Sequence, residues 1–397
     1  METKTIRELC DIVVDCPHST PKWTTSGKIV IRNNNIKKGR IDFSSPSYTD
    51  DEHFNLRVKR AIPRSGDIII TREAPMGEVG MIPERIECCL GQRMVLLRTN
   101  PDICDNYYLL YSLQSKFVQH QISWSEGTGT TVSNLRIPHL EQLKIPYVPL
   151  KKQRLVASVL KSIEEKIILN EQINNNLEQQ IEMVLLKTIN DTDTQPVKLG
   201  DYLYIKGRIG WKGLKKSEYL PISNYRIING ESLTLSGIDW NKAGYISAER
   251  YEESPEIMLS IGDILLSKDG TIGKIGYVDK LDASTSVASG IFVIRNTRQS
   301  EISTQFIYYL LKSKLFKAFI ASRTEGSVIP HLYQKDFMEF EFQLPSPDDM
   351  KIFDDTTADM FSLVFSNLNE NERLIHLRDS LLPKLMSGEL DVSDTDI

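Results

Sequence analysis

Two groups of basic and amide side chains are the residues of this sequence best suited to bind a ligand. The first group comprises Lys22, Trp23, Arg32, Asn33, Asn34, Asn35, Lys37, Lys38, Arg40, Lys59 and Arg60. The second group comprises Lys206, Arg208, Trp211, Lys212, Lys215 and Lys216. Lysine and arginine hold phosphate oxygens, and asparagine can pair bidentately with adenine in the major groove of DNA. One such cluster is often only a solvated face, so the occurrence of a cluster in each half is what favours nucleic-acid binding.

The net charge of −5 argues against nucleic acid only until it is divided along the chain. Residues 1–150 carry 19 Lys and Arg against 17 Asp and Glu, and residues 196–345 carry the same numbers. Residues 346–397 carry 4 basic against 12 acidic side chains, which supplies the surplus acid. Each half is therefore weakly basic, and a duplex can bind such a domain if its cations share one face.

Catalytic and metal-binding patterns are missing from the sequence. Gly270–Ile275 resembles a phosphate loop only superficially, because Lys268 stands where the first glycine is needed and Ile275 where Ser or Thr is needed. No methyltransferase motif, glycine fingerprint for S-adenosylmethionine or Gly-x-Ser-x-Gly is present, and the 6 histidines show no metal-ligand spacing. We therefore predict no catalytic residue, no metal site and no cofactor bound by this chain.

An internal repeat sets the organisation of the chain. Ala61–Ile82 aligns without a gap on Ile257–Val278, with Gly-Asp-Ile identical at 66–68 and 262–264. Thr71-Arg72-Glu73 faces Ser267-Lys268-Asp269, and further matches lie downstream at offsets near 197 residues. Half of the 397 residues is close to that offset, so the sequence predicts one module used twice.

Each module is predicted to be mixed α and β. Short apolar runs such as 28–32, 67–71 and 94–98 are typical of strands, because turn residues bound them, and 104–122 and 302–320 are typical of helices. The expected boundaries are residues 1–150 and 191–345 for the two domains, 151–190 and 346–390 for two helices, and 391–397 for a tail.

The two predicted helices carry matching apolar stripes. The positions expected to pair are Ile163, Ile167, Asn170, Asn174, Leu177, Ile181, Met360, Val364, Asn367, Asn371, Leu374 and Leu381. Both stripes are interrupted at the same point by two asparagines, which favours an antiparallel coiled coil because buried asparagine pairs penalise a slipped register. The alternative is two ordinary core helices with solvent-facing asparagines.

The remaining composition indicates an intracellular protein. No apolar run approaches the roughly 18–20 residues that cross a bilayer, so we expect no membrane contact and a cytoplasmic location. The 5 cysteines lie in the first third without a Cys-x-x-Cys pair, which predicts buried free thiols in a reducing compartment.

The pattern resembles a known family, the specificity (S) subunits of type I restriction-modification systems. The resemblance lies in 145–154 with the helix that follows, in 328–335, in 381–390 and in the repeated Gly-Asp-Ile, and it covers nearly the whole chain. One departure is Pro347-Asp-Asp-Met-Lys351, which replaces the Pro-x-x-x-Gln phrase expected at the second helix start. The family fold has two repeated target-recognition domains, pseudo-twofold symmetric, joined by two long antiparallel coiled-coil helices.

The resemblance implies a DNA sequence-recognition subunit without activity of its own. Each domain would read one half of a bipartite, asymmetric site in double-stranded DNA, and the helices would act as a spacer. The partners implied are two methyltransferase (M) subunits, which use S-adenosylmethionine, and restriction and translocase (R) subunits, which use ATP and Mg. The acidic last helix is then expected to dock protein rather than DNA.

Two other hypotheses stay open at this point. A non-catalytic coiled-coil scaffold could bind proteins through its globular domains, and tight, salt-sensitive binding to duplex DNA would exclude it. An enzyme, such as a nuclease with a divergent site, would show metal-dependent cleavage by the purified chain.

Overall fold

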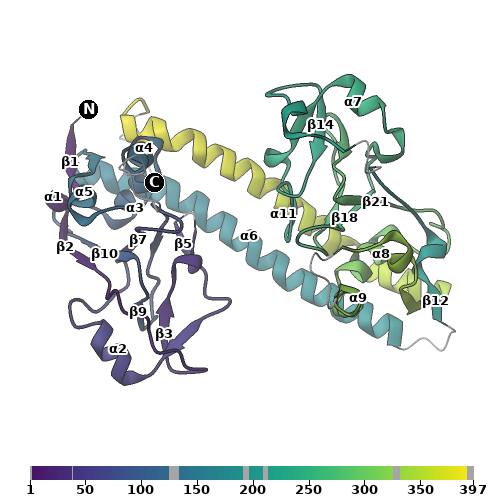
Figure 1. Cartoon of the computed structure of the whole chain (residues 1–397), viewed down its shortest axis with the longest axis horizontal. Coiled ribbons are helices and arrows are strands. Elements are labelled where there is room, and N and C mark those ends of the chain that lie inside the picture. Colours follow the sequence, from purple (N-terminus) through teal and green to yellow (C-terminus); the bar gives the residue numbers. More distant parts are fainter. Residues whose placement is uncertain are drawn as a thin grey trace. The chain divides into compact units, whose positions relative to one another are not determined.

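The structure is a computed structural model that describes residues 2–37, 39–124, 134–190, 196–208, 213–324 and 331–390. The chain divides into two compact units. The first contains Met1–Leu169 and Glu370–Ile397, and the second contains Asn170–Asn369. Each unit is described by itself, and Figure 1 labels its elements.

The first unit holds two small sheets, two two-stranded pairs and five short helices in its described part. A four-stranded sheet has the order β2-β10-β7-β8 and a three-stranded sheet the order β6-β3-β9. The strands are β1 (Thr3–Thr5), β2 (Cys10–Asp15), β3 (Lys28–Ile31), β4 (Ile36–Lys37), β5 (Arg40–Ile41), β6 (Ser47–Thr49), β7 (Ile68–Thr71), β8 (Val79–Met81), β9 (Cys88–Leu90), β10 (Met94–Thr99) and β11 (Lys144–Pro146). The helices are α1 (Ile6–Leu9), α2 (Asp51–Arg57), α3 (Asn106–Gln114), α4 (Lys116–Ser123) and α5 (Ile137–Gln142).

The second unit repeats this topology. Its sheets have the orders β13-β21-β18-β19 and β17-β14-β20. The strands are β12 (Pro196–Lys198), β13 (Leu203–Gly207), β14 (Tyr225–Ile228), β15 (Leu233–Thr234), β16 (Gly237–Ile238), β17 (Gly244–Ile246), β18 (Ile264–Ser267), β19 (Ile275–Tyr277), β20 (Ser284–Val287), β21 (Ile291–Asn296) and β22 (Glu341–Gln343). The helices are α7 (Ala248–Glu252), α8 (Thr304–Lys312), α9 (Lys314–Thr324) and α10 (Gln334–Met338).

Strand registers show that the two topologies are equivalent residue by residue. Lys28 lies opposite Thr49, and Tyr225 lies opposite Ile246, 197 residues later in both cases. The same offset relates the parallel partners Ile31 and Leu90 to Ile228 and Val287. The prediction of two copies of one mixed α/β domain is confirmed.

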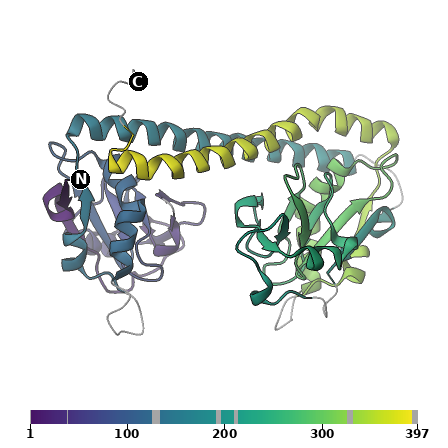
Figure 2. The ribbon, with the colours of Figure 1, turned by 90° about the horizontal axis from the view of Figure 1, so that it is seen from above.

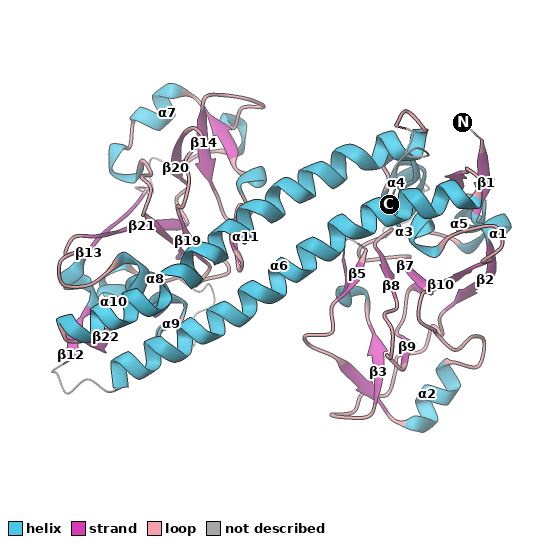
Figure 3. Cartoon of the chain, turned by 180° about the vertical axis from the view of Figure 1, so that it is seen from behind, coloured by secondary structure: helices cyan, strands magenta, loops and turns pink. Residues whose placement is uncertain are grey.

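Buried apolar strands form because each lies between two layers. All four side chains of β7 and all four of β18 are buried, as a strand packed on both faces requires. One face of β7 contributes Ile68 and Ile70 to a core with α3, and Ile69 lies in a core with β9. In Figure 3 the strands of each unit gather beside the short helices.

Two long helices complete the units, α6 (Leu150–Asn190) and α11 (Pro347–Ser387), each of 41 residues. The first half of α6 and the last part of α11 belong to the first unit, and the other parts belong to the second. In Figure 2 the α/β part of each unit lies along one side of its own helix segments. None of the described helices is both long enough and apolar enough to cross a membrane.

The helix segments pair in an antiparallel direction within each unit. In the first unit Val156, Ala157 and Leu160 pack against Leu385 and Met386, while Ile167 O accepts a hydrogen bond from Asn371 Nδ2 at 3.3 Å. Residue numbers rise along α6 as they fall along α11, so the segments run in opposite directions.

In the second unit the described parts of the helices meet through amides. Asn367 Nδ2 donates to Asn174 Oδ1 at 2.8 Å, and Asn174 Nδ2 donates to Val364 O at 3.0 Å. Both side chains are buried, as are Asn170 and Asn371. The alternative of solvent-facing asparagines is therefore wrong.

The stripe that the helices bury differs in part from the predicted one. Ile167, Ile181 and Val364 are fully buried. The predicted pairing positions that are only half-buried are Ile163, Leu177, Met360, Leu374 and Leu381. Leu185 and Ile189 are also buried although they are not among the predicted positions, because the helices also pack against α3 and α8 and their contact face is wider than a two-residue seam.

The short helices α3 and α8 link the sheets to the long helices. Tyr108 and Tyr111 of α3 face α6 and α11, while Leu109 and Leu113 of the same helix face the sheet core. In the second unit, Tyr308 of α8 packs edge-to-face against Phe361 of α11 at a centroid distance of 6.0 Å. In each unit a short helix therefore packs both on the larger sheet and on the long helices.

All five cysteines are buried and free, as predicted. Burial raises the pKa of Cys10 and of Cys88 to about 12, so both thiols stay protonated at neutral pH. They act as small apolar side chains in the first unit.

Candidate nucleic-acid interface

The first unit gathers polar side chains where three strands of its larger sheet end. Arg72 follows β7, Asp15 ends β2, and Arg93 comes just before β10. These strands are antiparallel neighbours, so the end of β7, the end of β2 and the start of β10 lie at one edge. We call Asp15, Arg72, Glu73, Arg93 and Asn134 the β7 rim.

Arg72 is the centre of the β7 rim. Its Nη1 donates to Asp15 Oδ2 at 2.9 Å, its Nη2 to Asn134 Oδ1 at 3.3 Å, and its Nε to Leu135 O at 2.9 Å. Arg93 is exposed and forms an ion pair with Glu73 at 3.2 Å. Arg93 is therefore available to a phosphate, while Arg72 organises the surface around it.

Four predicted DNA-contact residues lie beside the β7 rim. Arg32 lies over the ring of Trp23 at 5.3 Å, and Trp23 is 46% exposed. Asn33 Nδ2 donates to the carbonyl oxygen of Glu73 at 2.6 Å, which places Arg32–Asn33 beside the rim. Asn34 is exposed. This cation–aromatic pair offers a flat apolar surface and a charge side by side.

Lys22 lies on the same loop as Trp23 and is exposed. Its Nζ is 3.4 Å from Asp50 Oδ2. Hydrogen bonds from the backbone and ring of His53 are the main reason why the pKa of Asp50 falls to about 2, and the bond from Lys22 adds to them. Asp50 therefore stays ionised and caps α2 through the backbone N–H of His53.

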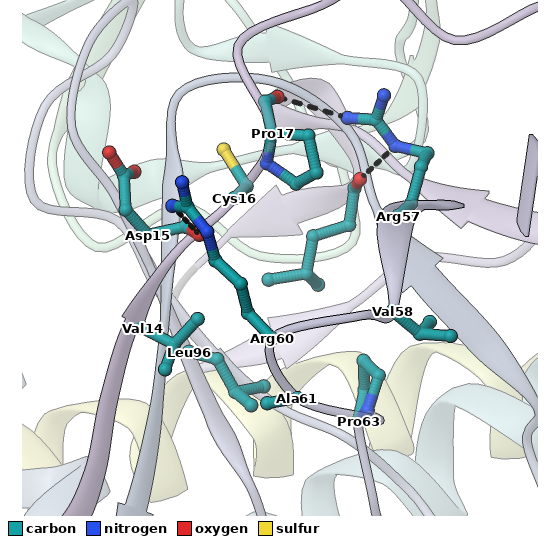
Figure 4. Close-up of a pocket in the computed structure, with 11 residues that line it drawn as sticks. Val14, Asp15, Cys16, Pro17, Arg57, Val58, Arg60, Ala61, Pro63 and Leu96 are labelled. Carbon is teal, nitrogen blue, oxygen red and sulfur yellow. Dashed lines mark hydrogen bonds between the residues drawn. The ribbon is translucent and has the colours of Figure 1, made fainter. Parts of the chain in front are cut away.

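Lys59 and Arg60 are exposed just after α2, and Arg60 Nη1 donates to Asp15 O at 3.4 Å. Figure 4 shows Arg60 and Arg57 around a small pocket with Asp15 and Cys16. Arg57 is buried and is bonded entirely to backbone carbonyls, so it faces the protein and not the solvent.

Two further residues of the first predicted cluster are held by protein partners. Asn35 is buried, accepts from Arg32 N and donates to Asp42 O, so it holds a turn and is not a free base-reading amide. Arg40 forms an ion pair with Glu164 of α6. The prediction of a DNA contact by Asn35 is corrected, because internal hydrogen bonds occupy its amide, whereas a DNA contact by Arg40 stays a prediction. Lys37 is exposed, and Lys38 lies outside the described residues.

The second unit has an equivalent edge with different side chains. Lys268 follows β18, Gly207 ends β13 and Gly290 precedes β21. Lys268 N donates to Gly290 O at 2.9 Å, and Leu332 N donates to Lys268 O at 3.0 Å. We call Lys268, Asp269, Gly290 and His331 the β18 rim.

Asp269 and His331 form a side-chain pair on the β18 rim. His331 Nδ1 is bonded to Asp269 Oδ1, and the imidazole packs edge-to-face on Tyr333 at a centroid distance of 4.5 Å. Lys268 lies over the ring of Phe292 at 4.8 Å, and burial lowers the pKa of its amine while Asp269 opposes that shift. The rim thus presents an imidazole edge, an aromatic ring and a cation.

The second predicted cluster divides in the same way as the first. Lys206 is exposed beside Tyr204, and Lys215 and Lys216 are exposed as well. Trp211 and Lys212 lie outside the described residues. Arg208 is only 2% exposed, and its Nε donates to Val287 O at 3.2 Å. The prediction of a DNA contact by Arg208 is therefore corrected.

The rims themselves were missed from the sequence as a site. The signal was present, because Thr71-Arg72-Glu73 and Ser267-Lys268-Asp269 match across the repeat. The repeat of two charged residues directly after a buried strand was the signal. His331 and Asn134 join the rims only through tertiary contacts. No sequence spacing connects those residues to the strands.

The part of the chain that the structure describes contains no cluster of side chains suited to bind a metal ion. Three or more His, Cys, Asp or Glu side chains never gather there in a geometry that could hold a metal ion. The polar groups of the rims are cations, amides and carboxylates held by protein partners, which suits binding.

Comparison with known proteins assigns the chain to a family. The family model "Type I restriction modification DNA specificity domain" matches residues 1–179 and 192–375. The specificity subunit of the type I restriction enzyme MjaVIII from Methanocaldococcus jannaschii is 23% identical over 392 residues, covering 90% of this chain and 88% of that protein. The putative MjaX specificity subunit of the same organism is 23% identical over 98% of this chain and 93% of that protein.

A solved structure supports the same assignment at the level of the fold. The S subunit of a type I restriction-modification system from M. genitalium matches 97% of this chain and 95% of its own, with a TM-score of 0.58 and 18% identity. The two family matches fall on the two repeats, which agrees with the duplication seen in the structure. The chain therefore belongs to the family of type I restriction-modification DNA specificity proteins, as the sequence indicated.

Proposed function

We propose that this chain is the DNA sequence-recognition subunit of a type I restriction-modification complex, and that each unit reads one half of a bipartite, asymmetric site in double-stranded DNA. One observation carries the proposal. The two units share one backbone frame, yet the β7 and β18 rims place different side chains at the same strand ends. Such an arrangement suits two readers of different half-sites.

We further propose that the chain is non-catalytic and acts in the cytoplasm. In this proposal it recruits two methyltransferase subunits, which use S-adenosylmethionine, and restriction and translocase subunits, which use ATP and Mg. The exposed face of α11 supports a protein-docking role, because it combines acidic residues with Ile352 at 61% exposure and Leu363 at 45%. An acidic face repels phosphate, so this surface is unsuited to DNA.

A direct test is to change one rim and determine both half-sites. The chain is reconstituted with its methyltransferase subunit, and methylated sites are mapped for the wild type and for Arg93→Ala with Trp23→Ala. We expect relaxed or altered specificity in one half-site only. The matched variant in the second unit, His331→Ala with Tyr333→Ala, should alter the other half-site only. A change in both half-sites from either variant would contradict the proposal.

Salt dependence separates DNA binding from a protein scaffold. Neutralised phosphates release counterions, so the logarithm of the binding constant should fall linearly with the logarithm of the salt concentration. Removing the exposed cations Lys22, Arg32 and Lys59 together should make that slope shallower by about two to three. An unchanged slope would place the DNA elsewhere on the molecule.

A further inference from the structure

Arg57 is the most unusual buried group of the first unit. It is 7% exposed and donates to four backbone carbonyls. The distances are 2.7 Å from Nε to Leu90 O, 2.8 Å from Nη2 to Gly91 O, 3.0 Å from Nη1 to Ser19 O and 3.2 Å from Nη2 to Pro17 O. None of the ion pairs formed among the described residues includes Arg57. Figure 4 shows two of these bonds.

The four carbonyls lie in, or directly before, the two loops that carry the polar edge of the unit. Pro17 and Ser19 begin the loop that presents Lys22 and Trp23. Leu90 ends β9, and Gly91 begins the loop that ends at Arg93. Gln92 Nε2 also donates to His18 O, so the loops touch each other beside the guanidinium. One side chain from α2 therefore fixes the relative position of both loops.

In the second unit a guanidinium also binds the carbonyl equivalent to that of Leu90, but the arginine that supplies it stands at a different position in the fold. Arg208 Nε donates to Val287 O, and Val287 is the register equivalent of Leu90. Arg208 follows Gly207, whose pairing with Phe292 matches that of Asp15 with Val95, so Arg208 corresponds to Cys16.

The exchange is reciprocal. In the second unit Ser254 stands at the position of Arg57, 197 residues later, and is fully buried. Arg208 Nη1 lies 3.5 Å from Ser254 Oγ, and its Nη2 lies 3.4 Å from Ser286 Oγ. One unit thus has cysteine and arginine at the two positions, and the other has arginine and serine.

We propose that Arg57 is a positioning residue for sequence reading, which holds the loops at the polar edge of the first unit without touching DNA. The inference rests on the proposed function, because it assumes that these loops read the half-sites. A buried charge with neutral partners is costly, so two independent solutions at one carbonyl are hard to explain by core stability alone. Only a planar guanidinium offers five donors in a fixed fork, which suits four convergent carbonyls.

The test transplants the arrangement of the second unit into the first. Three variants of the full chain are reconstituted with the methyltransferase subunit: Arg57→Lys, Arg57→Ser and the double variant Cys16→Arg with Arg57→Ser. The readout is the ratio of affinities for duplexes with a correct and an altered first half-site, and the same ratio for the second half-site.

The expected results are specific to one half-site. Arg57→Lys and Arg57→Ser should lower the first ratio by about tenfold, since one well-placed base contact contributes roughly that much discrimination. The second ratio should not change, and the salt slope should stay at the wild-type value because Arg57 neutralises no phosphate. The double variant should recover most of the first ratio.

Three results would overturn the inference. A shallower salt slope in Arg57→Ser would make Arg57 a direct contact, equal loss at both half-sites would make it a general stability residue, and an unchanged first ratio would remove its role. Phe54→Leu is the matched control, because it weakens the packing of the same helix and keeps the guanidinium. It should leave the first ratio unchanged.

Hydrogen exchange keeps the inference testable where a variant binds no DNA. Amides of 17–24 and 91–93 should exchange faster in Arg57→Ser than in the wild type, whereas amides of β7 and β10 should not. If the whole unit exchanges faster, the positioning role is wrong. If the wild-type complex itself shows no preference for any duplex, the proposed function fails, and the exchange measurement still decides whether Arg57 orders the loops.

Discussion

The two units share a frame but differ at their rims. In the first unit Arg98 Nε donates to Asp67 Oδ1 at 2.8 Å, and Arg98 Nη2 donates to Asp67 Oδ2 at 2.7 Å. In the second unit Arg295 makes the same bidentate pair with Asp263, at 2.7 and 3.0 Å. In both units the aspartate also accepts a hydrogen bond from the backbone N–H of the residue three positions earlier. The repeated bonds belong to the fold.

The rims solve one structural problem in two ways. In the first unit the guanidinium of Arg72 meets the carboxylate of Asp15 at the end of β2. In the second unit the equivalent residue is Gly207, and a Cβ built there would lie 3.3 Å from Lys268 Nζ. An ion pair in one unit is therefore replaced by a lysine over a glycine in the other. The copies therefore differ in side chain at strand ends that their backbones share.

The starts of the long helices differ too. Gln153 of α6 is buried, accepts from Asp105 N and donates to Ile103 O and Val148 O. The equivalent residue of α11, 197 residues later, is the buried Met350, which lies within the Pro347–Lys351 segment that departs from the family phrase. There Ser303 Oγ donates to Asp354 Oδ1 at 2.6 Å and supplies a polar link between α8 and the long helix. The helix begins normally, so the departure does not break the fold.

The largest effect is expected from breaking the shared frame. Asp67→Ala leaves the Arg98 guanidinium without its carboxylate and should destabilise the first unit by about 3–5 kcal/mol. Asp263→Ala should do the same to the second unit. Hydrogen exchange measured in β7, β10, β18 and β21 would assign each loss to its unit. Equal exchange in both units after either change would contradict the independence of the frames.

Removing the buried amide pair should have the next largest effect. Asn174→Leu removes the acceptor of Asn367 Nδ2 and the second donor to Val364 O, and it should cost about 1–3 kcal/mol. Adding Asn367→Leu should recover part of that loss, because both polar groups are then gone. Thermal denaturation of the single and double variants measures the difference, and a double variant less stable than either single would be the opposite result.

A smaller loss of stability is expected when the start of α6 is given the residue found at the equivalent position of α11. Gln153→Met should cost about 1–2 kcal/mol, because Asp105 N then loses a buried acceptor. Met350→Gln is the matched variant, and it should also destabilise, since no equivalent acceptor is needed beside Ser303. The exchange rates of α3 and α8 amides would separate the two effects, and a stabilised Met350→Gln chain would show that the two starts are interchangeable.

The smallest effect on stability is expected at the β18 rim. Asp269 and His331 are both partly exposed, so Asp269→Asn should change the unfolding free energy by less than about 1 kcal/mol. It should nevertheless weaken discrimination at the second half-site, because the imidazole loses the carboxylate that orients it. Glu73→Gln in the first unit is the matched control and should affect the first half-site only. A large stability loss without a change in specificity would make the pair structural.

Much of the fold follows from the sequence because it depends on local pattern. Buried runs such as Ile68–Ile70 and the long uninterrupted stripe of α6 need no tertiary information, and an offset near 197 residues already relates the two copies. The candidate site follows less well. Composition identified exposed Lys22, Trp23 and Arg32, but it also selected Asn35 and Arg208, which are buried. The charge of a residue in the sequence indicates that burying its side chain costs free energy. It does not show whether backbone carbonyls that converge on the side chain compensate for that cost.

By itself the sequence determined that one mixed α/β domain occurs twice, that each copy ends in a long helix and that asparagines interrupt both stripes. The tertiary structure alone decided which polar groups meet. Arg72 with Asn134, Asp269 with His331, and Arg57 with four carbonyls join segments separated by more than 30 residues. Periodicity records only which face of an element is buried, whereas contacts between distant loops depend on how the packed elements bring their ends together.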